Sequence, residues 1–287
     1  MGNPKRQHFV PQSVLRFFEG EDGQVFFFDK QSPNSDIEKR NRRSVFWQKH
    51  AYTLTHEDGT KNYSIEHEFG KEFDDKIGKL IQRRLTLSYS GLHCSLCKED
   101  RTLLLAFALN LFVRNPKTQA HVRGTAAFGA AHTVITLANS LCRRSALTVE
   151  AQTKELMLQS RNTNELASEF FDGFGVHFCM PSDENRSFVI GSLPICRFEP
   201  TEEEWITNPF GKSERQFEFF LPLAPRLAFL LSGKNNSDCP ISVPTDLVDK
   251  VNLKLFSQSD SVVSQSCTEI RTCVALNSSE ERECSFS

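Results

Sequence analysis

The chain has 287 residues, a hydrophobic content of 39% and a formal net charge of −2 at pH 7. This length can bury a substantial core as one large domain or two closely joined ones, because the buried fraction rises with chain size. The charge balance and a pI near 6.5 exclude a protein that is basic over its whole surface, so a nucleic-acid partner would require a local cluster of Lys and Arg.

The composition also bears on the core and on location. The chain has 25 Phe against 3 Tyr, which favours a dry aromatic core over a stacking surface. No continuous apolar run reaches the roughly 18 residues of a membrane helix, and the N-terminus lacks the apolar centre of a signal peptide. We therefore expect a cytoplasmic protein without a membrane partner.

The opening segment, residues 5 to 18, places one His and one Arg among large apolar side chains. Pro11 has its φ angle preset for a first helical turn and has no N–H to leave unpaired, so we expect a short helix from about residue 11 to 18. His8 then precedes this helix, and Arg16 lies within it. Two interpretations stay open: both side chains point into a cleft, or His8 is a buried or capping residue and Arg16 an ion-pair partner.

Residues 24 to 29 are apolar with too little alternation for a half-exposed strand, so a buried strand is predicted there. Residues 30 to 43 combine turn-forming residues with a basic run, which predicts a mobile loop. That run is the candidate nucleic-acid contact of the chain, although a charge run more often forms a solvated loop than a binding site. Its cations are Lys39, Arg40, Arg42 and Arg43.

Apolar residues recur at spacings of three and four from about residue 63 to 85, which predicts an amphipathic helix. Its opposite flank carries an acidic stripe of Glu68, Glu72 and Asp75, a pattern that could hold a divalent cation or transfer protons. Glu72 and Asp75 each precede a Lys by four residues, which favours a solvated face for those two. Glu68 stays a candidate functional carboxylate, with Glu66 beside it in the first turn.

Residues 99 to 113 are apolar nearly all round and predict a buried helix, with Arg114 at its C-terminal end and Pro116 stopping it. A buried guanidinium needs a partner, because an unpaired buried charge costs several kcal/mol. The partner of Arg114 is either a core carboxylate such as Glu68 or a ligand phosphate. A further long helix is predicted over residues 119 to 142.

The second half of the chain starts with one or two helices over residues 148 to 172 and then returns to strands. We expect strands near residues 175–179, 186–190, 217–221 and 227–231, a helix opening at Pro244, and a frayed polar tail over residues 277–287. The fold class is therefore α+β in one domain, residues 1–276, with a helical centre packed on a mostly antiparallel sheet.

Nine cysteines in a cytoplasmic chain are typically reduced thiols. Only His93-Cys94-Ser-Leu-Cys97 has the spacing of a metal site, and a tetrahedral zinc site needs a second pair of ligands. The remaining cysteines form no second C-x-x-C. We therefore expect neither a metal nor a cofactor.

The opening segment also carries a resemblance, because His8-Phe-Val-Pro11 is followed by Leu15, Arg16 and Phe18. This spacing resembles the motif H-[YF]-[VI]-P-x-x-x-L-R-x-F of a bacterial family, domain of unknown function 4238. Residues 114–116 resemble its later R-x-P landmark and residues 222–225 its P-L-x-P. Where the family usually reads S-D-N-P, this chain has Gly191-Ser-Leu-Pro194, so Ser192 stands in the place of an Asp. If that Asp is essential to a family chemistry, this chain has altered or lost it.

The sharper catalytic motifs do not occur in the sequence: there is no G-x-x-x-x-G-K-[ST], no G-x-G-x-x-G, no H-E-x-x-H and no nucleophile elbow. Catalysis would therefore need residues from distant segments. The His, Arg and acidic landmarks of the resembled family suit metal-independent phosphodiester cleavage, in which a His moves the proton and Arg stabilises the phosphate charge. They also suit nucleotide binding in a Phe-walled pocket.

We therefore expect a toxin-like or anti-phage defence effector that acts on nucleic acid or nucleotide phosphates, such as a metal-independent nuclease. His8 is the expected general acid or base, Arg16 and Arg114 the phosphate clamps, and Glu68 the orienting carboxylate. The alternative is a non-catalytic interaction subunit of a defence or regulatory complex, in which these residues form a buried polar network. Convergence of the four on an open pocket favours the first function, and mutual pairing under a protein cover favours the second.

Overall fold

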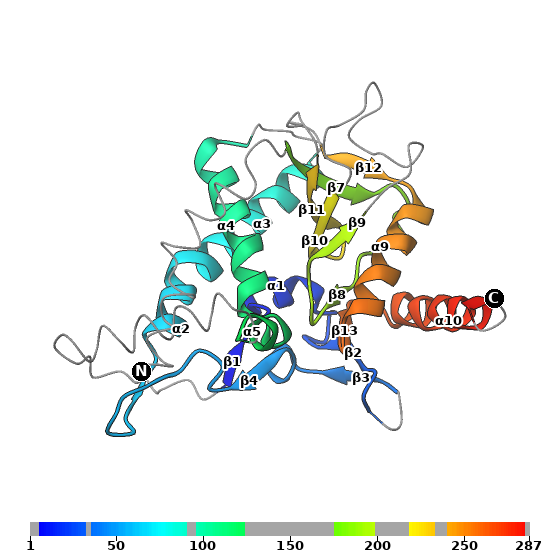
Figure 1. Ribbon diagram of the computed structural model, residues 1–287. Helices are drawn as coiled ribbons and strands as arrows, with labels where there is room; N and C mark the ends of the chain where they lie inside the picture. The colour runs from blue at the N-terminus through cyan, green and yellow to red at the C-terminus, as the bar shows by residue number, and fades with distance from the viewer. Residues whose placement is uncertain are drawn as a thin grey trace.

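The computed structural model describes residues 6–32, 36–90, 96–123, 175–198, 218–232 and 240–284, which form helices and mostly antiparallel sheets (Figure 1). The α+β class predicted from the sequence is confirmed. Among the described helices, none has an apolar stretch long enough to cross a bilayer.

A five-stranded sheet forms the centre of the described part. In spatial order its strands are β12 (Ile241–Val243), β7 (Gly175–Pro181), β11 (Leu227–Ser232), β10 (Glu218–Ala224) and β9 (Cys196–Phe198). Neighbouring strands are antiparallel, except that β12 and β7 run parallel. The strands predicted near residues 175–179, 217–221 and 227–231 are thus present in the described residues, each lengthened by its pairing.

The strand predicted over residues 186–190 is mostly wrong, because only Ile190–Gly191 (β8) forms a ladder. The reason is that the preceding backbone groups bond elsewhere. The Phe188 N–H donates to the Pro225 carbonyl at 2.8 Å, and the Val189 N–H donates to the side-chain oxygen of Asn252 at 3.0 Å.

A second sheet has the order β3-β2-β13-β8. The buried strand predicted over residues 24–29 is confirmed as β2 (Val25–Asp29), and it pairs with β13 (Ser261–Ser264) from the far end of the chain. The loop predicted for residues 30–43 is wrong in part, because β3 (Ile37–Arg40) pairs antiparallel with β2. Lys39 and Arg40 therefore lie on a strand.

Two short ribbons and the N-terminal helices complete the first third of the chain. The ribbons pair β1 (Arg6–His8) with β4 (Trp47–Lys49) and β5 (Leu54–Thr55) with β6 (Lys61–Asn62). The helix expected over residues 11–18 forms as α1 (Gln12–Leu15) continued by the 3-10 turn η1 (Arg16–Phe18). A further 3-10 turn, η2 (Arg42–Ser44), leads into β4.

The helix predicted over residues 63–85 is present with an interruption. It consists of α2 (Ser64–Phe69), the π-helical turn η3 (Gly70–Asp74) and α3 (Asp75–Tyr89). The predicted buried helix is confirmed as α4 (Lys98–Arg114), and α5 (Pro116–Arg123) follows it. The rest of the helix expected over residues 119–142, and the helices expected over 148–172, lie outside the described residues.

Helices cover both faces of the central sheet (Figure 1). On one face, α3 and α4 pack in a core with residues such as Val176, Leu221 and Phe229. On the other face, α9 (Thr245–Gln258) packs in a second core with residues such as Phe220 and Leu230. The sequence predicts helices on a sheet, and the structure adds that the sheet lies between two helical layers.

The tail expected from residue 277 is instead helical through Cys284, as part of α10 (Cys267–Cys284). Two hydroxyls of this polar stretch find their acceptors within the helix itself. The Ser278 hydroxyl donates to the Val274 carbonyl at 2.9 Å, and the Ser279 hydroxyl donates to the Leu276 carbonyl at 2.7 Å.

Candidate functional site

His8 ends β1 and lies opposite Trp47 in the β1–β4 ribbon. Its side chain is 9% exposed, so it sits at the boundary between core and surface. Nε2 lies 3.3 Å from the carbonyl oxygen of Arg43, and the amide nitrogen of Gln12 lies 3.4 Å from Nδ1 and 3.3 Å from Nε2. This arrangement fits a ring that carries its proton on Nε2, donates to Arg43 and accepts at Nδ1.

Burial is the main cause that lowers the pKa of His8 below its usual 6.5. The carbonyl of Arg43 raises the pKa, the charge of Arg114 lowers it, and the charge of Asp74 raises it again. His8 is therefore neutral at pH 7, and it shares an electrostatic environment with the Arg114–Asp74 pair. The charges of Arg114 and Asp74 thus act on His8, although Arg114 lies more than a hundred residues away in the sequence.

Arg114 ends α4 with its side chain 1% exposed, and its guanidinium donates to both carboxylate oxygens of Asp74, at 2.8 and 3.2 Å. Its Cζ atom lies 4.5 Å from the centre of the Phe69 ring, a cation–π contact that suits a desolvated guanidinium. The core-carboxylate partner is therefore the correct alternative, but the carboxylate is Asp74 of the π-helical turn. The pairing of Arg114 with Glu68 is wrong.

Glu66 is the second carboxylate of this cluster. Burial raises the pKa of Glu66 to about 7, with the charge of Asp74 raising it further and that of Arg114 lowering it. Tyr52 also contacts this cluster, because its fully buried hydroxyl donates to the Arg114 carbonyl at 3.1 Å. The buried Gln7 accepts the Tyr52 N–H at 2.5 Å and ties the cluster to β1. We call His8, Tyr52, Glu66, Asp74 and Arg114 the core polar cluster.

Arg16 lies apart from these contacts. It is exposed, its guanidinium donates to the Gly78 carbonyl at 2.9 Å, and its Cζ lies 4.7 Å from the Phe17 ring centre. A Cβ on Gly78 would lie 3.1 Å from the Cβ of Ser13 and 3.3 Å from the Arg16 guanidinium. Gly78 thus lets α1 approach α3, and the structure assigns Arg16 to this helix contact. Glu68 is half-buried on α2.

The basic run predicted as a nucleic-acid contact is largely neutralised within the chain. Lys39 pairs with Asp22 at 2.6 Å, Arg40 with Glu38 at 2.8 Å, and Arg42 with Glu19 at 2.5 Å. Arg43 is exposed, and within the described residues its side chain forms no ion pair. Three of the four predicted cations therefore already have an anionic partner.

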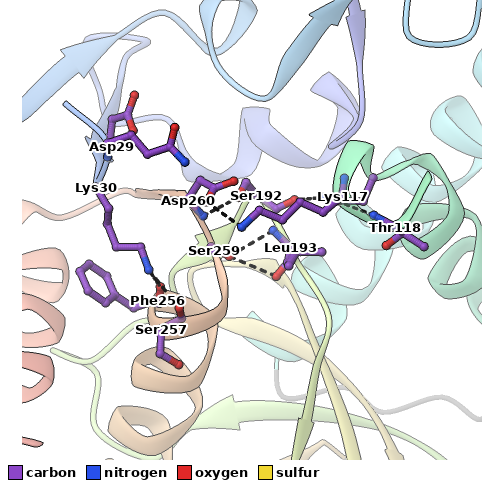
Figure 2. Close-up of polar contacts among 12 residues, drawn as sticks. Asp29, Lys30, Lys117, Thr118, Ser192, Leu193, Phe256, Ser257, Ser259 and Asp260 are labelled. Atoms are coloured by element: carbon purple, nitrogen blue, oxygen red, sulfur yellow. Dashed lines mark hydrogen bonds and ion pairs between the residues drawn. The ribbon is translucent and has the colours of Figure 1, made fainter. Parts of the chain in front are cut away.

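Two family landmarks meet at Asn115, the residue between Arg114 and Pro116. Its amide nitrogen donates to the Ser192 carbonyl at 2.6 Å, and its oxygen accepts the Lys117 N–H at 2.8 Å, at the start of α5. The Ser192 hydroxyl accepts the Asp260 N–H at 3.1 Å, and Lys117 pairs with the Asp260 carboxylate at 2.6 Å (Figure 2). Ser192 is 7% exposed, and its contacts connect Asn115 at the end of α4 with Asp260, which precedes β13.

The cysteines near residue 95 give no complete metal site in the described part of the chain. The Cys97 thiol caps α4 by accepting the Asp100 N–H at 3.4 Å. Cys94 and His93 lie outside the described residues. Within those residues, no group of three or more His, Cys, Asp or Glu side chains is arranged to hold a metal ion.

Comparison with family models assigns the chain to a family. A model described as protein of unknown function, DUF4238, matches residues 6–268. The chain belongs to the DUF4238 family. The predicted family is thereby confirmed, and in this DUF4238 chain the matched region takes in both sheets and the core polar cluster. No curated protein and no solved structure matches the chain.

Asp74 and Tyr52 are members of the cluster that the sequence did not predict. Asp74 was hidden by the π-helical turn, which changes the helix face that it occupies. Tyr52 is one of only 3 tyrosines, and a buried Tyr usually needs a hydrogen-bond partner. The small number of tyrosines was therefore the one sequence signal that could have indicated a polar role for Tyr52.

Proposed function

We propose that this DUF4238 chain acts on a phosphodiester or nucleotide phosphate, with His8 as the group that transfers the proton. The observation that carries the proposal is the position of His8. It stands opposite Trp47 in the β1–β4 ribbon, and the charges of Arg6 and of the Arg114–Asp74 pair act on its ring. A histidine at such a boundary is shielded enough to stay neutral at pH 7 and near enough to the surface for a phosphate to reach.

The neutral ring is the form that accepts a proton. Nδ1 is the basic nitrogen in the hydrogen-bond arrangement around His8, and the Gln12 amide now occupies it. A water or ribose hydroxyl in place of that amide would lose its proton to Nδ1 as it attacks phosphorus. Burial is the main cause that disfavours the imidazolium, and the charges of Arg114 and Arg6 disfavour it further. It therefore returns the proton to the leaving oxygen, which completes general acid–base catalysis.

Arg16 and Arg114, which were expected to bind the substrate phosphate, already have partners within the chain. Arg16 and Arg114 are held by Gly78 and Asp74, so the negative charge of a substrate would be met by exposed cations of the ribbon instead. A toxin-like or defence role for this chemistry stays a prediction, and growth inhibition on overexpression is its cellular readout.

A second function, a non-catalytic interaction subunit of a defence or regulatory complex, is favoured by one specific observation. The Arg114 side chain is 1% exposed and bonded at two points to Asp74. A guanidinium used in this way stabilises the fold and is not available to a ligand. In that case the whole core polar cluster would be structural.

The two functions separate on the variant His8→Ala, with His67→Ala as the matched control on the exposed face of α2. We expect His8→Ala to lower hydrolysis of single-stranded oligonucleotides or bis-p-nitrophenyl phosphate by about 10²- to 10⁴-fold. The thermal midpoint should change little, and EDTA should not inhibit. Retained hydrolysis in His8→Ala, or a loss that only follows the loss of folded protein, would instead support the interaction subunit.

A further inference from the structure

One face of the β1–β4 ribbon combines cationic side chains with an aromatic one, the two kinds of group by which proteins bind single-stranded nucleic acid. Arg6 is opposite Lys49 and His8 is opposite Trp47 in the antiparallel register. Paired residues, and residues two apart on a strand, share one face of a ribbon. Arg6, His8, Trp47 and Lys49 therefore line a single face, which we call the ribbon face.

The cations around the ribbon face differ from those of the neighbouring basic run. Arg6, Lys49 and the adjacent Arg43 are exposed, and among the described residues none of the three forms an ion pair. Lys39, Arg40 and Arg42 each have a carboxylate partner. The two sets carry the same formal charge, but only the ribbon set has charge left for an external anion.

An aromatic platform lies among these cations. The half-buried Trp47 indole has the Arg6 guanidinium 4.6 Å from its ring centre, and its Nε1–H donates to the Ser44 carbonyl at 3.1 Å. A flat guanidinium on an indole offers planar surface to a base. The half-buried indole thus has cations beside it on the same face of the ribbon.

The backbone at both ends of β4 is held in an uncommon conformation. Phe46 and His50, which flank β4, have φ angles of 51° and 58°, and they are the only non-glycine residues with positive φ in the described chain. Such strain persists only where surrounding packing fixes it, and it concentrates at ligand clamps. Phe46 is 4% exposed and packs on Phe9, with ring centres 5.9 Å apart. The platform is therefore presented on a rigid strand.

We infer that the ribbon face binds single-stranded nucleic acid, with a base stacked on the Arg6–Trp47 pair and phosphates on Arg43 and Lys49. Stacking requires an unpaired base, because the bases of a duplex are already stacked on each other. The inference rests on the proposed function only in that it names the substrate class of the His8 site. His8 lies on the same face, so a strand that follows the cations would bring a phosphate to it.

Binding of a fluorescein-labelled 20-nucleotide oligo(dT), oligo(U), the matching duplex and heparin to the full chain tests the inference. Three variants are compared with the wild type: the ribbon triple R6Q/R43Q/K49Q, the paired triple K39Q/R40Q/R42Q with the same change of charge, and Trp47→Leu. Trp47→Phe serves as a conservative rescue, and thermal unfolding checks that each variant folds. In a Trp205→Phe background, Trp47 is the remaining tryptophan, and its fluorescence should be quenched by either single strand.

We expect both single strands to bind more tightly than the duplex or heparin. The ribbon triple should reduce the slope of log affinity against log salt by about 1.4, since it removes the two phosphate contacts of Arg43 and Lys49 and each lost single-strand contact removes roughly 0.7. The paired triple should leave this slope nearly unchanged. Trp47→Leu should weaken binding roughly tenfold, and Trp47→Phe should restore most of it.

The inference is overturned if no single strand binds at low salt, if both triples lose affinity equally, or if duplex or heparin binds as tightly. The first result means no site, and the others mean binding by bulk charge. The outcome for the proposed function is separate. Strand binding on the ribbon face without His8-dependent hydrolysis would refute the catalysis alone. His8-dependent hydrolysis with an unchanged KM in the ribbon triple would refute the ribbon face alone.

Discussion

The guanidinium of Arg114 and the carboxylate of Asp74 form a two-point ion pair across two elements, the end of α4 and the π-helical turn before α3. The two partners differ in exposure, because Arg114 is 1% exposed and Asp74 is 21% exposed. Asp74 therefore keeps part of its hydration while Arg114 has lost nearly all of it. The pair is stabilising mainly because it prevents an uncompensated buried cation.

The variant Asp74→Ala should lower the free energy of unfolding by about 3–5 kcal/mol, because it leaves Arg114 buried without its partner. Urea unfolding measures this, with Glu72→Gln as the control. Glu72 forms an exposed i,i+4 pair with Lys76 at 2.8 Å, and its loss should cost at most about 0.5 kcal/mol. Equal costs for the two variants would mean that solvent screening at Asp74 outweighs the burial of Arg114.

The long elements were predictable because their own side chains determine them. The stretch that forms α4 is apolar on nearly every side, and β2 is a run of Phe and Val. β3 was not predictable in the same way. Ile37–Arg40 contains one apolar residue among charged ones, so it is a strand only because β2 offers it an edge to pair with. Pairing between distant segments is not visible in a local pattern.

Gly191→Ala should destabilise the protein by about 1–3 kcal/mol, because added volume in a packed site forces the structure to shift. A Cβ at Gly191 would lie 2.1 Å from the Ser259 hydroxyl and 3.2 Å from the Leu255 carbonyl. The double variant with Ser259→Gly should recover part of the loss, since it removes the nearest atoms. Thermal unfolding of the two single variants and the double variant measures their coupling. Strict additivity would rule out the contact as the cause.

His177 should make the fold sensitive to acid. It lies on β7, 3% exposed, and burial lowers its pKa to about 4. The folded state thus binds fewer protons than the unfolded state between pH 6.5 and about 4, so this contribution to stability is lost as the pH falls through that window. The unfolding free energy of the wild type, relative to that of His177→Leu, should therefore fall by about 1.4 kcal/mol for each unit that the pH falls in this window. A constant difference across the window would contradict the prediction.

The carboxylates of the core polar cluster could not be identified from helix periodicity because of the π-helical turn. In a regular helix each residue turns by about 100°, so residue 74 would lie roughly 80° around the axis from residue 66. A π turn absorbs about one extra residue and brings that angle near −20°. Glu66 and Asp74 thereby reach the same side, where both act on Arg114. The acidic stripe predicted from the sequence is valid only for a helix without such an interruption.

Glu66 should give the opposite pH dependence from His177. Burial raises its pKa to about 7 from a usual 4.5, so the folded state holds its proton more tightly than the unfolded state. Stability from this group is fully present below pH 4.5 and is lost as the pH rises toward 7. Glu66→Gln mimics the protonated form, so its thermal midpoint should exceed that of the wild type at pH 8 and match it near pH 5. Glu68→Gln, two residues along the same helix, is the control, and a gain at pH 8 of equal size in both variants would show that general charge removal, and not burial beside Asp74, is responsible.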